Sequence, residues 1–180
     1  MTQYPENLES QKTQSPPISL TKATLCFLIR GDEILLARKK RGFGRGLWNG
    51  AGGKVLVGES IEAAMKRETR EEIGVAVCAW EKVAVLNFYF IDKPDWNQQV
   101  WAFFCEEWEG EPQESEEMAP QWFNQKELPF EKMWADDGLW LPEVLMSKKI
   151  RGDFLFNQLG EILESKLEET QDFLQEVTSP

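Results

Sequence analysis

Residues 53–75 contain a short helix with clear start and stop signals, and this segment restricts the fold more than any other stretch. Ser60 can cap its N-terminus, because a serine hydroxyl accepts a hydrogen bond from an unpaired backbone N–H group. Glu62 is favourable in the first turn, and Gly74 suits the left-handed conformation that ends many helices. The sequence therefore predicts a helix over about 61–73.

Three acidic residues of this helix, Glu68, Glu71 and Glu72, are spaced i, i+3, i+4 and so project from one face. Their charges repel each other unless a cation lies between them, and hard oxygen ligands suit Mg2+, with Mn2+ as an alternative ion. Such an ion lowers the pKa of a bound water so that it can attack phosphorus. Glu59 and Arg67 are placed to pair and to fix the loop against the helix.

A solvated surface helix laced with salt bridges is the alternative interpretation, since Glu and Arg are common helix formers. It is disfavoured because seven fixed identities coincide at set spacing: Gly53, Glu59, Arg67, Glu68, Glu71, Glu72 and Gly74. This pattern resembles the Nudix box, the signature of hydrolases that cleave a nucleoside diphosphate linked to another moiety. Thr69 departs from the aliphatic residue that the family prefers, and we expect a local packing adjustment there.

Composition excludes several classes of function. The chain has 180 residues, a net charge of -11 and no histidine. The charge argues against binding polymeric nucleic acid or anionic membrane, and the missing histidine rules out Ser-His or Cys-His catalysis. No apolar run reaches the roughly 20 residues of a membrane span, and no signal peptide is recognisable. We expect a cytoplasmic, soluble monomer that acts on a small nucleotide.

The three cysteines, Cys26, Cys78 and Cys105, are an odd number at wide spacing. Cys26 and Cys105 lie inside apolar runs, where a free thiol behaves as a small hydrophobe. We interpret the cysteines as buried structural thiols, with metal ligands or a disulfide as the alternatives.

Alternation and turn residues predict the remaining elements. Strands are expected at 24–29 and 34–36, joined by a tight turn as a hairpin, and at 82–91 and 99–107, which form an antiparallel pair. Further strands are expected at 121–123 and 151–156, with a helix over 139–149 whose Pro142 lies in the first turn. Mostly antiparallel strands with a few helices indicate an α+β or α/β domain. The Nudix resemblance implies an α/β/α sandwich with a mixed sheet.

Both ends of the chain differ in composition from this domain. Residues 1–20 are polar and rich in Gln, Ser and Pro, and we expect a disordered tail. The domain is expected over 21–157. Residues 158–180 carry apolar side chains at helical spacing, which predicts an amphipathic helical extension that could mediate self-association; these are Leu159, Ile162, Leu163, Leu167, Phe173, Leu174 and Val177.

The resemblance extends over about 21–156 and points to the oxidised-purine nucleoside triphosphatase branch of the family. Its segments include 38–44, 47–50, 52–55, 116–118, 129–130 and 133–137. It implies that Asn49, Asp136 and Asp137 bond the purine, with Trp134 and Phe43 beside the ring. It also implies a substrate site that includes Thr24, Lys39, Gly52, Gly53, Lys54 and Phe88, and that Gly52 and Glu117 join Glu68, Glu71 and Glu72 around metal.

Side-chain chemistry is consistent with these roles. An Asn amide offers a donor and an acceptor, and an indole offers a flat stacking surface. Adjacent carboxylates in a desolvated pocket do not both ionise readily, so one of Asp136 and Asp137 can hold a proton and donate. A solvent-facing turn is the alternative for this pair, and core packing is the alternative for Trp134.

Three departures bear on base preference. Ala135 replaces a proline of the family's Trp-Pro-Asp-Asp segment, the chain is one residue longer near Pro94, and Gln98 stands where an apolar pocket residue is expected. The leading hypothesis is hydrolysis of oxidised purine nucleoside triphosphates, which cleanses the nucleotide pool. The alternatives are a Nudix hydrolase of another nucleoside diphosphate derivative and a non-catalytic nucleotide-binding regulator.

Overall fold

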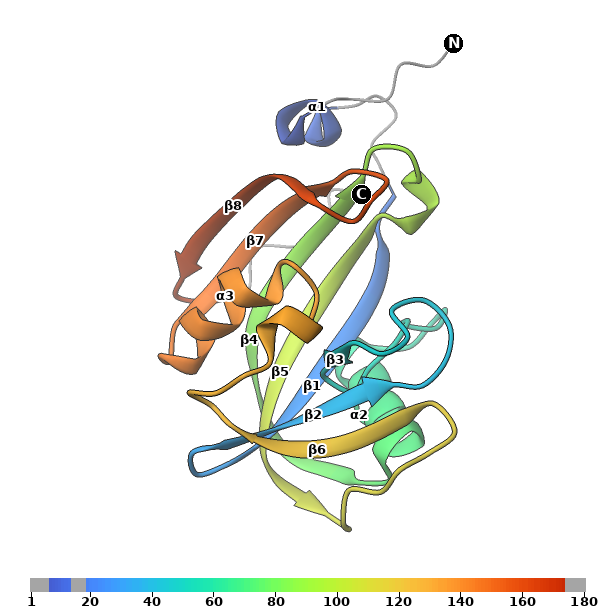
Figure 1. Cartoon of the computed structure of the whole chain (residues 1–180), viewed down its shortest axis with the longest axis vertical. Coiled ribbons are helices and arrows are strands. Elements are labelled where there is room, and N and C mark those ends of the chain that lie inside the picture. The colour runs from blue at the N-terminus through green and yellow to red at the C-terminus, as the bar shows by residue number, and fades with distance from the viewer. Residues whose placement is uncertain (1–6, 14–18, 174–180) are drawn as a thin grey trace.

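A computed structural model describes residues 7–13 and 19–173 (Figure 1). The elements are α1 (Leu8–Lys12), β1 (Thr21–Arg30), β2 (Glu33–Lys39), β3 (Trp48–Asn49), α2 (Ile61–Ile73), β4 (Ala76–Phe90), η1 (Pro94–Trp96), β5 (Gln98–Glu109), β6 (Met118–Asn124), η2 (Phe130–Lys132), α3 (Asp137–Leu145), β7 (Lys149–Phe156) and β8 (Ile162–Thr170). Within the described ranges, none of the helices has both the length and the apolar character needed to span a membrane.

The strands form one mixed sheet in the order β3-β2-β1-β5-β4-β7-β8, with β6 paired to β2. The pairs β1–β5 and β4–β7 are parallel, and the other pairs are antiparallel. The expected hairpin of β1 and β2 and the expected antiparallel pair of β4 and β5 are both confirmed.

β1 and β2 pair only next to their shared turn, at Ile29–Ile34 and Arg30–Glu33, and then separate (Figure 1). A glycine-rich loop takes the vacated place beside β1. The backbone N–H of Cys26 donates to the Ala51 carbonyl at 2.6 Å, and that of Thr24 donates to the Gly53 carbonyl at 2.9 Å. This loop is thereby held against the sheet next to α2.

The two faces of the sheet pack against different helices. Successive residues of a strand point to opposite faces, so Val85 joins the cluster around Met65 of α2, while Leu86 joins the cluster around Trp140 and Leu141 of α3. Trp140 and Leu141 are fully buried. The result is the expected α/β sandwich with a mixed sheet.

The helix predicted after residue 158 is wrong for the described part of that segment, because Ile162–Thr170 form strand β8. β8 pairs antiparallel with β7, which leaves no helix there for self-association. The unpaired N–H and C=O groups at the edge of β7 favour a strand over an isolated helix. Leu167 packs over Gly152, where any Cβ would lie 2.9 Å from a Leu167 methyl carbon. Residues 174–180, including Leu174 and Val177, lie outside the described ranges.

The expectation of a disordered tail is also wrong for residues 8–12, which form α1. Asn7 caps this helix, accepting a hydrogen bond from Ser10 N–H at 2.8 Å. The backbone N–H of Leu8 donates to Glu164 of β8, and Lys12 pairs with Asp153 of β7. α1 is therefore attached to the same β7–β8 edge.

Two smaller expectations change as well. α3 spans Asp137–Leu145, earlier than predicted, so Pro142 lies inside the helix and not in its first turn. Cys26 and Cys105 are buried thiols as expected, but Cys78 is exposed on β4.

Candidate active site

α2 has the predicted bounds and both predicted caps. The Ser60 hydroxyl accepts a hydrogen bond from Ala63 N–H at 3.1 Å. Gly74 has a φ of 78° and donates its N–H to the Arg70 carbonyl. Any residue with a Cβ is strained in that conformation, so glycine ends the helix here at low cost.

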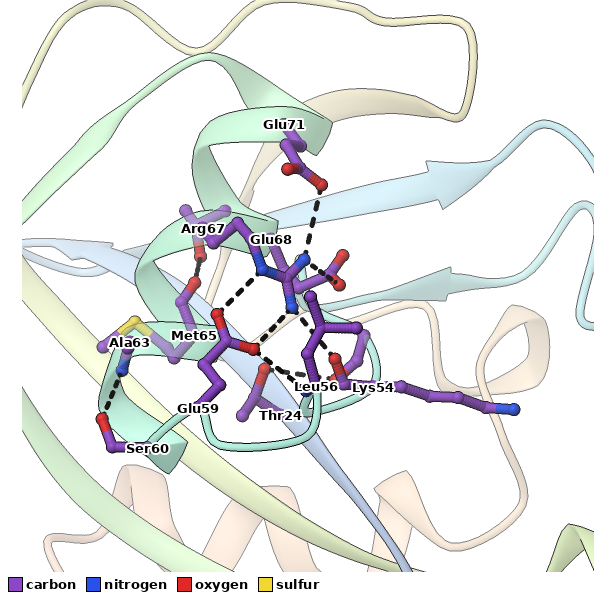
Figure 2. Close-up of polar contacts among 12 residues, drawn as sticks. Thr24, Lys54, Leu56, Glu59, Ser60, Ala63, Met65, Arg67, Glu68 and Glu71 are labelled. Carbon is purple, nitrogen blue, oxygen red and sulfur yellow. Dashed lines mark hydrogen bonds and ion pairs between the residues drawn. The ribbon is translucent and has the colours of Figure 1, made fainter.

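Arg67 lies at the centre of an ion-pair cluster on α2 (Figure 2). Its guanidinium donates two hydrogen bonds to the Glu59 carboxylate, both at 2.9 Å, and one to the Lys54 carbonyl at 3.1 Å. Another nitrogen contacts Glu68 at 2.6 Å and Glu71 at 3.5 Å. The predicted Glu59–Arg67 pair is confirmed. It is a bidentate ion pair that attaches the loop before α2 to the helix.

This pairing changes the ionisation of both partners. The Arg67 guanidinium holds the pKa of Glu59 below its usual value, and a hydrogen bond from Leu56 N–H acts in the same direction. Glu59 and Glu68 in turn raise the pKa of Arg67. Arg67 thus stays charged and fixes the two carboxylates that flank it.

Two glycines allow the loop at 52–53 to approach its neighbours closely. A Cβ on Gly52 would lie 1.9 Å from the Thr24 carbonyl oxygen, and a Cβ on Gly53 would lie 2.6 Å from the Glu68 carboxylate. Backbone closes the space at Gly52, and a side chain at position 53 would have to displace the Glu68 carboxylate. Gly52 and Gly53 therefore bring backbone polar groups directly against the carboxylates of α2.

Glu72 is the buried acid of this face, with 6% of its surface exposed. Its carboxylate accepts a hydrogen bond from Gly52 N–H at 2.8 Å. Burial raises the pKa of Glu72 to about 7; the Gly52 hydrogen bond and Lys39 oppose this rise, while the charges of Glu68 and Glu117 add to it. Acids from α2 and from the loop before β6 therefore act electrostatically on one another.

These residues supply only oxygen donors, the chemistry that suits a hard divalent cation. As they lie, within the described ranges no three acidic or sulfur side chains converge closely enough to hold an ion. Arg67 holds Glu68, and Arg41 pairs with Glu117 and lowers its pKa. Glu68 and Glu117 repel the charge of Glu72, and a bound cation would relieve this repulsion. This set of oxygen ligands therefore fits a divalent metal.

A cavity of about 430 Å3 opens beside the glycine loop, and several predicted site residues line it. These are Thr24, Lys39, Phe43, Asn49, Gly52, Gly53, Lys54, Phe88, Trp134, Asp136 and Asp137. None of Glu59, Arg67, Glu68, Glu71, Glu72 and Glu117 lines it. The carboxylates and the cavity adjoin through Gly52, which lines the cavity and donates to Glu72.

The polar wall of this cavity is built by β3 and the start of α3. Asn49 lies on β3, where pairing with Ala37 of β2 fixes its backbone. Asp136 accepts a hydrogen bond from the Trp140 indole N–H at 3.1 Å, and Asp137 accepts one from Trp134 N–H at 3.0 Å. These contacts hold both carboxylates in place.

Both aspartates are buried, with 5% and 2% of their surfaces exposed. Burial raises the pKa of Asp136 to about 6. The pKa of Asp137 is raised well above its ordinary value by burial and then by the neighbouring Asp136. A proton shared between the two makes one a donor and leaves the other an acceptor.

Aromatic rings form the rest of the wall. The Phe43 and Trp134 ring centroids lie 4.9 Å apart. Gly44 keeps them close, because a Cβ there would lie 2.6 Å from the Trp134 indole. Trp48, by contrast, packs against Phe123 and the core.

Sequence reasoning missed three aromatic residues of this cavity: Phe90, Trp96 and Phe156. They come from the ends of β4 and β7 and from η1, far from the Nudix box in sequence. The one available signal was the longer turn near Pro94.

Comparison with known proteins agrees with this geometry. Residues 19–144 match the NUDIX domain family. The chain is 46% identical over 149 residues to an oxidized purine nucleoside triphosphate hydrolase of Danio rerio, and 43% identical over 150 residues to that of Mus musculus. These alignments cover 83% of this chain in both cases, and 95% and 96% of the two relatives.

The MutT protein of Bacillus halodurans has a similar solved structure, with a TM-score of 0.73 and 29% identity. The match covers 83% of this chain and 98% of that one. The family match covers most of the chain, and the acidic helix with its Arg67 ion pairs and the adjoining cavity agree with it. The chain therefore belongs to the Nudix hydrolase family.

Proposed function

We propose that this protein hydrolyses oxidised purine nucleoside triphosphates, of the 8-oxo-dGTP and 2-hydroxy-dATP type, to nucleoside monophosphate and pyrophosphate with Mg2+. Nudix hydrolases generally use a divalent metal. The relatives named oxidized purine nucleoside triphosphate hydrolases support the substrate class. Such an activity removes damaged precursors from the nucleotide pool.

The observation that carries this proposal is the buried pair Asp136 and Asp137, which line the cavity together with Asn49. A nucleotidase that bound only the phosphates would have no need of two desolvated acids in addition to the proposed metal ligands. With one proton between them, the pair presents a donor and an acceptor, and Asn49 adds an amide with both. This set can distinguish purine edges that differ in carbonyl and amino groups.

The remaining charged residues have two proposed roles: basic side chains bind the phosphates and acidic side chains bind the metal. Lys39 and Lys54 line the cavity and supply positive charge for the phosphates. Glu68, Glu71, Glu72 and Glu117, with the Gly52 carbonyl, would hold the metal. When bound, the metal neutralises phosphate charge and activates a water for attack on phosphorus. Arg67 holds Glu59 and Glu68 in place between the loop and the helix.

The test is kcat/KM of the purified chain with Mg2+ for 8-oxo-dGTP, 2-hydroxy-dATP and dGTP, with a dinucleotide polyphosphate and a nucleotide sugar for comparison. We expect monophosphate and pyrophosphate as products and a preference of about tenfold or more for an oxidised purine, equivalent to one base hydrogen bond. Equal rates on dGTP, or faster turnover of another nucleoside diphosphate derivative, would refute the proposed substrate.

A further inference from the structure

A continuous row of aromatic rings lines the cavity. Neighbouring ring centroids are 4.6 to 6.0 Å apart along the series Trp134, Phe43, Trp96, Phe90, Phe156 and Phe88. Trp96 is the ring that joins the two halves of this row. It contacts Phe43 from the β2–β3 loop at 4.6 Å and Phe90 at the end of β4 at 5.8 Å.

The turn that carries Trp96 is held firmly in place. Asn97 is buried, and its side-chain oxygen accepts the Phe90 N–H at 2.8 Å. The Asn97 carbonyl accepts the Thr21 N–H at 3.0 Å, which ties the turn to β1. Ile91 N–H donates to the Phe156 carbonyl, which ties it to β7. η1 and the β7–β8 turn accordingly lie at the same end of the sheet (Figure 1).

The exposure of Trp96 distinguishes it from a core residue. Its side chain is 41% exposed and that of Phe43 is 52% exposed, although both line the cavity. Lys93 places its ammonium 3.8 Å from the Trp96 ring centroid, a cation–π contact that orients the indole. Large aromatic rings left exposed at a cavity rim mark a ligand contact, because burying them on binding is favourable.

We infer that Trp96 is a specificity-determining residue whose indole packs against the base beside Phe43 and selects bicyclic purines over monocyclic pyrimidines. The inference rests on the proposed function, since it assigns a further contact to the same nucleotide site. Stacking uses the flat face of the base and is indifferent to its hydrogen-bonding edge. It grows with ring area, so a purine gains more than a pyrimidine. Trp96 therefore selects the base by the size of its ring system, while Asn49, Asp136 and Asp137 recognise the hydrogen-bonding edge of the base.

Trp96→Leu, Trp96→Phe and the control Trp80→Leu separate this assignment from a structural effect. Trp80 is a comparably exposed indole on β4, outside the cavity lining and also covered by a lysine, Lys66. For each variant KM and kcat are measured with 8-oxo-dGTP, dGTP and dTTP, and dGMP binding is measured by calorimetry. Thermal unfolding confirms that each variant is folded.

We expect Trp96→Leu to raise KM for both guanine triphosphates, and Kd for dGMP, about tenfold, with kcat changed less than twofold. The dTTP values should change less than twofold, so the purine preference falls. Trp96→Phe should recover most of the affinity, and Trp80→Leu should match the wild type.

Unchanged KM in Trp96→Leu, a loss in kcat alone, or an equal loss for dTTP would overturn the inference. The proposed function fails separately. If the wild type turns over dGTP and 8-oxo-dGTP equally, the oxidised-purine preference is lost, yet a shared KM rise in Trp96→Leu still supports the stacking contact.

Discussion

Around Arg67, Glu59 and Glu68 lie against a positively charged side chain, whereas at the start of α3 two acids lie against each other. Arg67 contacts Glu59 and Glu68 directly, and its guanidinium holds the pKa of Glu59 below the usual value. Asp136 and Asp137 are buried side by side. Burial raises both pKa values, the charge of Asp136 raises that of Asp137 further, and hydrogen-bond donors oppose these rises. The first arrangement suits constant charge for metal and phosphate, and the second suits a proton that can move to match a base.

The largest expected effect tests the carboxylate side. Glu72→Gln keeps the shape but removes a charge from the proposed metal site, so kcat/KM should fall about 10^3-fold, or roughly 4 kcal/mol, on every substrate alike. Steady-state assays with Mg2+ on 8-oxo-dGTP, 2-hydroxy-dATP and dGTP measure this. Glu106→Gln, an exposed position on β5, is the matched control. Near-wild-type turnover in Glu72→Gln would remove the metal assignment.

The buried pair should appear in the pH dependence of stability. An unfolded Asp ionises near pH 3.9, but Asp136 in the folded state ionises near pH 6. Between these values the folded state binds more protons, so stability falls as pH rises through that window. Asp136→Asn cannot ionise, and should gain up to about 3 kcal/mol relative to wild type between pH 4 and pH 7.

Urea unfolding at several pH values measures this gain. Asp32→Asn, in the exposed β1–β2 turn, is the control and should show no such trend. A constant difference between wild type and Asp136→Asn across this range would contradict the raised pKa of Asp136.

Base reading should separate the two regions most sharply. Asp137→Asn and Asn49→Ala leave the α2 carboxylates untouched, so their losses should be unequal across bases. One lost base hydrogen bond costs about 1 to 3 kcal/mol, or roughly 5- to 150-fold in kcat/KM. The comparison uses 8-oxo-dGTP, 2-hydroxy-dATP and dGTP across pH. A uniform loss on all three would show that these residues do not read the base.

The smallest expected effect concerns the ion pairs of Arg67 with Glu59 and Glu68. Arg67→Lys keeps the charge but loses the two-pronged contact with Glu59, and should lower kcat/KM roughly tenfold for all substrates. Arg70→Lys, exposed on the same helix, should behave as wild type. A base-dependent loss in Arg67→Lys would break the separation between the two regions.

Short-range sequence patterns were enough to predict several features of the structure. The caps of α2, its carboxylate face and the Glu59–Arg67 pair follow from short-range spacing, since a helix places residues i, i+3 and i+4 together whatever surrounds it. The two hairpin-like strand pairs follow from alternation and turn residues. The substrate-site residues came from family resemblance, and their grouping around one cavity agrees with it, although their functions stay predictions.

Long-range packing decided the rest. The apolar residues after 158 have helical spacing, yet the open edge of β7 and the space above Gly152 make a strand of Ile162–Thr170. Trp96 reaches the cavity only because Asn97 ties its turn to neighbouring strands. The sequence by itself determined the charged helix, because its hydrogen bonds lie within one segment. Only the tertiary structure determined the aromatic wall and the last strand, because their partners lie far away along the chain.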